Sequence, residues 1–105
     1  MTLTRVWQYD VRPEAEAAFV AAYGAEGSWA RLFSASDGYV GTELFRSVET
    51  PGRYLTVDRF LDQPTWRRFL ADQGGAYRQL DERCADLTLV EQELAEVDDG
   101  QDLRR

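Results

Sequence analysis

The sequence contains no histidine, lysine, asparagine or isoleucine, and Cys84 is its only cysteine. Without histidine and with one cysteine, the chain lacks the usual ligands of a structural zinc site and the partners that activate a catalytic serine or cysteine. The absence of lysine removes Schiff-base chemistry and the attachment point of a pyridoxal cofactor. No disulfide bond can form within the chain, so we expect Cys84 to be a small buried apolar side chain.

Positive charge is also scarce. The 12 basic residues, all arginine, are outnumbered by 19 acidic residues, which gives a net charge of −7. Nucleic-acid binding depends on neutralising phosphates, so this balance disfavours a nucleic-acid partner. No stretch approaches the ~18 consecutive apolar residues of a membrane helix, and the first residues show no signal-peptide pattern. We therefore expect a cytoplasmic protein with no membrane partner.

The 105 residues, of which 12% are aromatic, are enough for one domain with its own core. We assign residues 1–96 to this domain. Residues 97–105 are rich in acidic side chains and show no apolar periodicity, which predicts an acidic flexible tail.

Apolar periodicity predicts strands that alternate with helices. Strand patterns occupy residues 5–11, 39–46, 53–60 and about 87–94. Helical spacing is predicted for residues 13–23, 28–33 and 62–73, then again for 77–87 after a break at Gly74 and Gly75. The linker 49–52 favours a hairpin between the two central strands.

This order predicts an α+β fold on the ferredoxin-like βαββαβ plan, with an antiparallel sheet and its helices on one face. Both faces of the hairpin strands carry large apolar side chains, so the helix-free face needs a cover. We expect a second copy of the chain to supply it, in a homodimer that buries Tyr54, Phe60 and the last strand. The same alternation predicts that Arg59 faces the helices and Asp58 the dimer partner.

Several segments carry a resemblance to a known family. They are Val6–Tyr9, the block Tyr23–Phe33 with Gly27–Trp29 and Leu32–Phe33, Gly38–Leu44, Pro51–Phe60, Phe69, Tyr77 and Leu80–Asp81. In these residues the chain resembles the antibiotic biosynthesis monooxygenase family, whose members are dimeric α/β barrels of ferredoxin-like subunits.

The resemblance implies oxygen insertion into a phenolic, quinol or polyketide-type aromatic small molecule. It implies no metal, flavin or other cofactor, because the ionised substrate itself reduces O2. Well-understood relatives use an asparagine with a tryptophan in the pocket, and haem-degrading relatives add a histidine. This chain has neither asparagine nor histidine, which removes the haem-degrading function.

Two residues are the catalytic candidates. We expect Arg59 to stabilise the anion of the substrate, since an opposite charge lowers the pKa of a phenol. Trp66 would help to hold the aromatic ring flat. The candidates for substrate binding are Tyr23, Trp29, Phe33, Phe69 and Tyr77. Aromatic side chains at helical spacing more often belong to a core, and charged residues such as Asp58 and Arg59 more often form structural ion pairs.

Three function classes stay open. The first is a cofactor-independent monooxygenase, and the second is a non-catalytic small-ligand-binding or stress-associated protein of the same fold. RNA binding is the third, because RNA-recognition motifs share this topology. The acidic charge and the lack of lysine disfavour it.

Overall fold

The computed structural model describes residues 2–98. Its elements are, in chain order, β1 (Leu3–Val11), η1 (Pro13–Ala15), α1 (Glu16–Tyr23), α2 (Ser28–Phe33), β2 (Tyr39–Arg46), β3 (Arg53–Phe60), α3 (Gln63–Cys84), η2 (Ala85–Leu87) and β4 (Thr88–Asp98). The strands form one antiparallel sheet in the order β2-β3-β1-β4. The predicted α+β, ferredoxin-like fold is confirmed.

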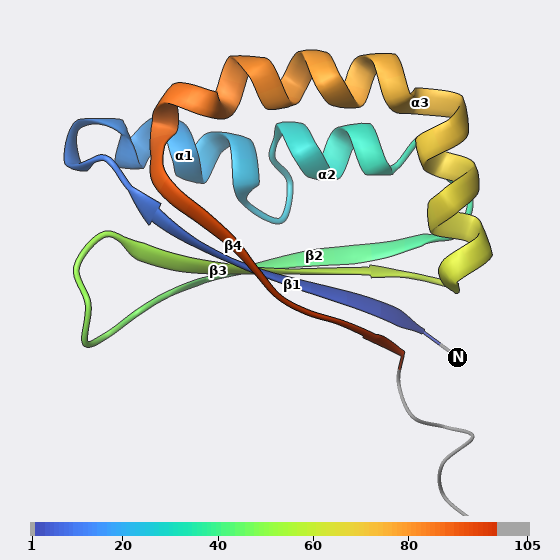
Figure 1. Ribbon diagram of the computed structural model, residues 1–105, viewed down its shortest axis with the longest axis horizontal. Helices are drawn as coiled ribbons and strands as arrows, with labels where there is room; N and C mark the ends of the chain where they lie inside the picture. Colours follow the sequence, from blue (N-terminus) through green and yellow to red (C-terminus); the bar gives the residue numbers. More distant parts are fainter. Residues whose placement is uncertain (1, 99–105) are drawn as a thin grey trace, which may run out of the picture.

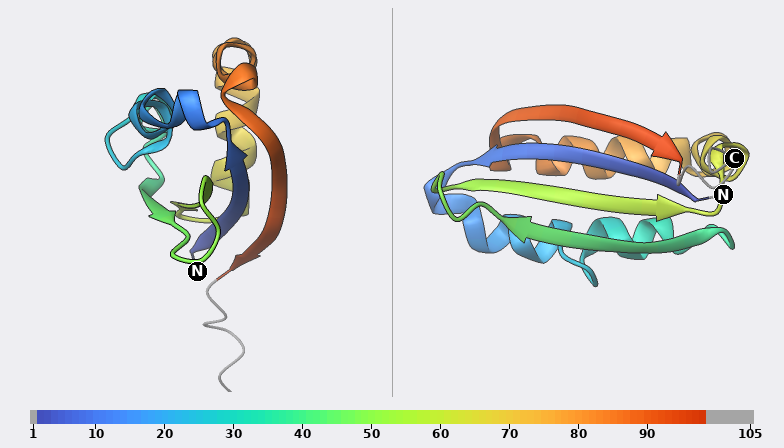
Figure 2. Two further views of the ribbon diagram at one scale, coloured as in Figure 1. Left: turned by 90° about the vertical axis from the view of Figure 1, so that its left-hand side faces the viewer. Right: turned by 90° about the horizontal axis from the view of Figure 1, so that it is seen from below.

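The molecule has two layers. Helices α1, α2 and the second half of α3 cover one face of the sheet (Figure 1). The other face, seen from below in Figure 2, carries no helix among the described residues. Among these residues, no helix is long and apolar enough to cross a membrane. A cytoplasmic location stays a prediction.

The last strand is longer than its sequence pattern suggests. Val97 and Asp98, the first residues of the predicted tail, belong to β4 and pair with Thr4 and Leu3 of β1. Pairing with a long neighbouring strand, rather than apolar alternation, decides where β4 ends. Residues 99–105 of the predicted tail lie outside the described residues.

Helix α3 consists of two helical segments joined by a kink, as the sequence predicts. Its N-cap is Asp62, whose Oδ1 accepts hydrogen bonds from the backbone N–H of Thr65 at 2.8 Å and from its hydroxyl at 2.6 Å. The bend lies at Gln73 (φ −118°, ψ 16°), and the helix continues through Gly74 and Gly75. The predicted break at these glycines is confirmed to within one residue, because the non-helical residue Gln73 directly precedes Gly74.

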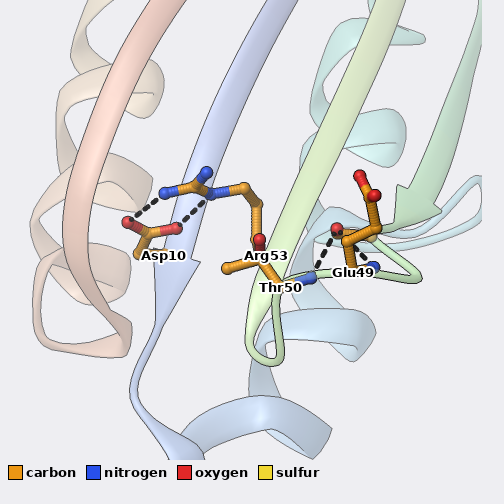
Figure 3. A network of polar contacts seen from close by, with 5 residues as sticks. Asp10, Glu49, Thr50 and Arg53 are labelled. Carbon is orange, nitrogen blue, oxygen red and sulfur yellow. Dashed lines mark hydrogen bonds and ion pairs between the residues drawn. The ribbon is translucent and has the colours of Figure 1, made fainter.

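The predicted hairpin between β2 and β3 is present, and Figure 3 shows its turn. The hydroxyl oxygen of Ser47 accepts hydrogen bonds from the backbone N–H groups of Glu49 at 3.2 Å and Thr50 at 3.0 Å. Gly52 has a φ of +80°, a left-handed conformation that favours glycine. Its carbonyl accepts a hydrogen bond from the N–H of Val11 at 2.8 Å, which ties the turn to the end of β1.

An ion pair between side chains also links β1 to the start of β3 near this turn. Arg53 at the start of β3 donates two hydrogen bonds to Asp10 of β1, at 2.8 and 3.2 Å (Figure 3). The contact lowers the pKa of Asp10, since Arg53 stabilises its ionised form. Both side chains are partly exposed, so we expect this pair to specify strand alignment more than to stabilise the fold.

The core is an aromatic cluster between the sheet and the helices. Phe19 of α1 and Phe60 of β3 are fully buried in it. Tyr54 also lies in this core, so the prediction that Tyr54 and Phe60 line a dimer interface is wrong. Alternate residues of β3 share a face, as predicted, but the two faces are assigned the wrong way round. Large apolar side chains occur on both faces of β3, so the pattern does not tell which face meets the helices.

The helix-free face is apolar as well, although with other residues. Cross-strand pairing places there the side chains of Val6, Phe45, Leu55, Val57, Val90, Ala95 and Val97. Phe45, Val90 and Val97 are each about half exposed in the single chain. Both faces of the sheet therefore carry large apolar side chains, as expected. The residues on the helix-free face are not the ones that the sequence predicts.

Replacing Phe60 by alanine tests the core. Because the ring is fully buried, we expect Phe60→Ala to lower the free energy of unfolding by about 3–5 kcal/mol. Val48→Ala in the exposed turn is the control and should change it by less than about 0.5 kcal/mol. Urea unfolding measures both, and equal effects of the two changes would show that the core is misassigned.

Candidate functional site

A cavity of about 220 Å³ opens between the sheet and the helices. The sheet contributes Arg5, Trp7 and Tyr9 from β1, Thr42 from β2, Thr56 and Asp58 from β3, and Glu91 from β4. The helical layer contributes Tyr23, Trp29, Phe33, Tyr77 and Asp81. Alternate residues of a strand point to one face, so Arg5, Trp7 and Tyr9 follow the cavity for about 13 Å along β1.

Aromatic rings form most of its wall. Trp29 lies edge-on to Tyr77 with ring centroids 4.9 Å apart, and Tyr23 lies 4.9 Å from Tyr9. The structure thus brings together four of the five predicted substrate-binding residues: Tyr23, Trp29, Phe33 and Tyr77. Phe69 does not line the cavity, because it is buried in the core and stacked on Trp66.

The cation of this cavity is Arg5, which is 8% exposed. The central carbon of its guanidinium group lies 4.0 Å above the ring of Trp66, a cation–π contact. Its Nε atom is 3.8 Å from a carboxylate oxygen of Glu96 and has no hydrogen-bond partner. A buried donor without a partner is uncommon in a folded protein, and here it belongs to a cavity-lining residue.

Opposite Arg5 in the register of β1 and β3 lies Asp58, also buried. Burial raises the pKa of its carboxyl, while a hydrogen bond from Thr42 and the charge of Arg5 lower it by less. The hydroxyl of Thr42 donates this bond to Oδ1 of Asp58 at 2.6 Å. A buried carboxyl with a raised pKa at a cavity wall is typical of a general base.

Arg59, the predicted catalytic cation, lies elsewhere. Its side chain is on the helix-free face, where it forms an exposed ion pair with Glu43 of β2. The prediction that Arg59 faces the helices is therefore wrong, as is the opposite prediction for Asp58. Trp66 does not line the cavity either. It lies beneath Arg5, so it contributes by holding the cation in place.

The remaining polar groups of the cavity are hydroxyls, two indoles and two further acids. Burial raises the pKa of Tyr9, Tyr23 and Tyr77, which keeps these hydroxyls neutral donors near pH 7. The Nε1 atom of Trp29 is buried without a hydrogen-bond partner. Burial also raises the pKa of Glu91. Together, these groups suit an uncharged aromatic ligand with oxygen substituents.

Arg5 is not among the site residues that the sequence suggests, although one pattern in the sequence marks it. Arg5, Trp7, Tyr9 and Val11 alternate with Val6, Gln8 and Asp10. An arginine that shares its face with two large aromatic residues in a predicted strand is a candidate for a buried cation. The pattern alone leaves open which face the helices cover.

No metal site is evident in residues 2–98: they contain no group of three or more histidine, cysteine or acidic side chains placed to hold an ion.

The fold and the sequence both have known counterparts. Residues 2–74, more than half of the chain, match the family model described as antibiotic biosynthesis monooxygenase. The chain belongs to this family. A comparison with curated proteins finds no match.

Several solved structures share the fold of the chain. A variant of SnoaB, a cofactor-independent oxygenase from Streptomyces nogalater, superposes with a TM-score of 0.71 at 20% identity, over 99% of this chain and 98% of that chain. A putative antibiotic biosynthesis monooxygenase from Bordetella bronchiseptica gives 0.67 at 23% identity, over 91% and 97%. One from Nitrosomonas europaea gives 0.68 at 11% identity, over 89% and 86%.

Replacing Arg5 tests the buried charges of this monooxygenase-family site. Arg5→Leu removes the charge that opposes the burial of Asp58 and the cation–π contact with Trp66, so we expect the free energy of unfolding to fall by about 1–3 kcal/mol at neutral pH. The deficit should shrink in mildly acidic solution. The pKa of Asp58 is higher in the folded than in the unfolded chain, so the folded state gains protons as the pH falls and its buried charge is removed.

The matched control is Arg59→Leu, which makes the same change in an exposed ion pair on the opposite face. It should lower the free energy of unfolding by less than about 1 kcal/mol. Urea unfolding at the two pH values measures both variants. A deficit for Arg5→Leu that does not change with pH would contradict this account of Asp58.

Proposed function

We propose that the protein is a cofactor-independent monooxygenase that acts on a phenolic, quinol or polyketide-type aromatic small molecule. The observation that carries this proposal is the placement of two buried opposite charges, Arg5 and Asp58, in an aromatic-walled cavity of about 220 Å³. An aromatic ring fits between the rings of Trp29 and Tyr77 on one side and the sheet on the other. Its hydroxyl group then meets a cation and a proton acceptor.

The first step is ionisation of the substrate. Asp58 accepts the proton of the bound hydroxyl, and the guanidinium of Arg5 stabilises the phenolate that forms. Burial makes Asp58 a stronger proton acceptor than an exposed carboxylate, because it raises the pKa of the carboxyl. Arg5 thus has the role that the sequence suggests for Arg59, which is to stabilise the anion of the substrate by its positive charge.

The second step uses O2 as the oxidant. The phenolate transfers one electron to O2, and the resulting superoxide and substrate radical combine into a peroxide at a ring carbon. Loss of water from that carbon, with the proton returned by Asp58, leaves a ketone. One oxygen atom enters the product and the other leaves as water, so a phenol and O2 give a quinone and H2O.

Oxygen uptake with α-naphthol tests the proposal. We expect the protein, freed of metal by a chelator and of flavin by dialysis, to consume O2 and form naphthoquinone that carries one atom from isotopically labelled O2. Binding of α-naphthol without oxygen uptake would instead support a non-catalytic ligand-binding protein. A requirement for added metal or flavin would contradict the mechanism.

Two variants identify the groups involved. Asp58→Asn removes the proton acceptor, and we expect the turnover rate to fall by about a hundredfold or more. Trp29→Phe keeps an aromatic ring but removes the unpartnered N–H, for which a fall of about tenfold is expected, or ~1.4 kcal/mol of transition-state stabilisation. Arg59→Leu should leave turnover unchanged.

We also propose that two copies pair through the helix-free face, which carries apolar side chains on all four strands. Val57→Glu places a charge at its centre, beside Val6, and should give a monomer by static light scattering. Val48→Glu in the exposed turn is the control and should leave the dimer intact. A wild-type particle with the mass of one chain at micromolar concentration would show that this face has another use.

A further inference from the structure

We infer that Tyr39 and Thr42 are positioning residues for Asp58: their hydroxyls form a one-way chain of donated hydrogen bonds that holds this carboxylate ionised and oriented toward the bound substrate. Only the statement that Asp58 is oriented toward a bound substrate rests on the proposed function. The chain of hydrogen bonds is a feature of the structure without ligand.

Two short contacts make up this hydroxyl chain. The Oγ1 atom of Thr42 lies 2.6 Å from Oδ1 of Asp58, and the phenolic oxygen of Tyr39 lies 2.6 Å from the same Oγ1. Thr42 and Asp58 are both buried and lie opposite each other in the register of β2 and β3. Tyr39 is partly buried against Phe33 and Phe60 of the core.

A bulge in β2 makes the arrangement possible. Residues three apart in a regular strand point to opposite faces of the sheet. Here the register shifts between Tyr39, which pairs with Phe60, and Gly41, which pairs with Arg59. The extra residue turns Tyr39 to the face of Thr42. Bulges commonly redirect a side chain in this way near functional sites.

The direction of donation follows from the chemistry of the three groups. An ionised carboxylate only accepts hydrogen bonds, so the single hydrogen of the Thr42 hydroxyl is donated to Asp58. The oxygen of Thr42 is then an acceptor for the hydroxyl of Tyr39. Each donation polarises the next, which strengthens the bond that reaches Asp58.

This hydroxyl chain opposes the effect of burial. Hydrogen bonds to the charged form of a carboxyl lower its pKa, and the bond from Thr42 does so for Asp58. The other groups that act on Asp58 or respond to it are Arg5 and Tyr9 on β1 and Tyr77 on α3. Arg5 is the cation among them, and burial keeps the two tyrosines neutral. Because Thr42 engages Oδ1, the proton of a bound hydroxyl is accepted by Oδ2.

The experiment is a pH titration of the Asp58 carboxyl carbon by NMR in the protein without ligand. We expect Thr42→Val, which removes the hydroxyl and keeps the shape, to raise the pKa of Asp58. Thr42→Ser restores the hydroxyl and should restore the pKa. Tyr39→Phe keeps the ring and the bond from Thr42, so it should raise the pKa by a smaller amount.

Tyr54→Phe is the matched control. Tyr54 is a buried tyrosine of β3 that does not line the cavity, and its loss of a hydroxyl should leave the titration of Asp58 unchanged. An unchanged titration in Thr42→Val, or in Tyr39→Phe if the valine variant does not fold, overturns the inference. So does a failure of Thr42→Ser to restore the wild-type value.

The same variants separate this inference from the proposed function. If the protein oxidises α-naphthol, the acidic limb of its pH–rate profile should move to higher pH in Thr42→Val together with the NMR titration. Titrations that shift as expected in a protein without oxygen uptake support the positioning role and contradict the monooxygenase proposal. Oxygen uptake with unchanged titrations contradicts the positioning role alone.

Discussion

Arg5 and Asp58 lie opposite each other on neighbouring strands, both under the helices, and the charge of Arg5 opposes the effect of burial on the pKa of Asp58. A lone buried charge is costly, so the fold surrounds the two with specific contacts: Trp66 beneath the guanidinium and Thr42 against the carboxylate. Both charges line the cavity together with aromatic side chains of the core, so its wall is part polar and part aromatic.

The bend in α3 connects this pair of charges to the aromatic wall. The first half of the helix carries Trp66 to the end of β1 where Arg5 lies, and the second half carries Tyr77 back over Trp29 (Figure 1). In a straight helix these two residues would lie about 16 Å apart along the axis, whereas the ring centroids of Trp66 and Tyr77 are 6.2 Å apart. The change of direction at Gln73 is therefore part of how the site is built.

The two faces of the sheet differ in function: one lines the cavity, and the other is the proposed contact between two copies. Arg5, Asp58 and Thr42 face the cavity, whereas Arg59 and Glu43 pair on the face without helices. Adjacent residues such as Asp58 and Arg59 thus serve opposite surfaces. In the proposed dimer, a substitution at one position of β3 affects the site, and a substitution at the next affects the contact between copies.

The sequence by itself determined the order of strands and helices, the hairpin at Arg53, the family resemblance and most of the aromatic wall, because these depend on local periodicity and turn chemistry. Only the tertiary structure decided which face of β3 meets the helices. Tyr54 and Phe60 alternate with Leu55 and Val57, and both sets are apolar enough to be buried. The packing of helices against the larger rings selects between them. This packing places Asp58 on the face under the helices and Arg59 on the helix-free face. The residue pattern of a single strand cannot predict which face the helices cover.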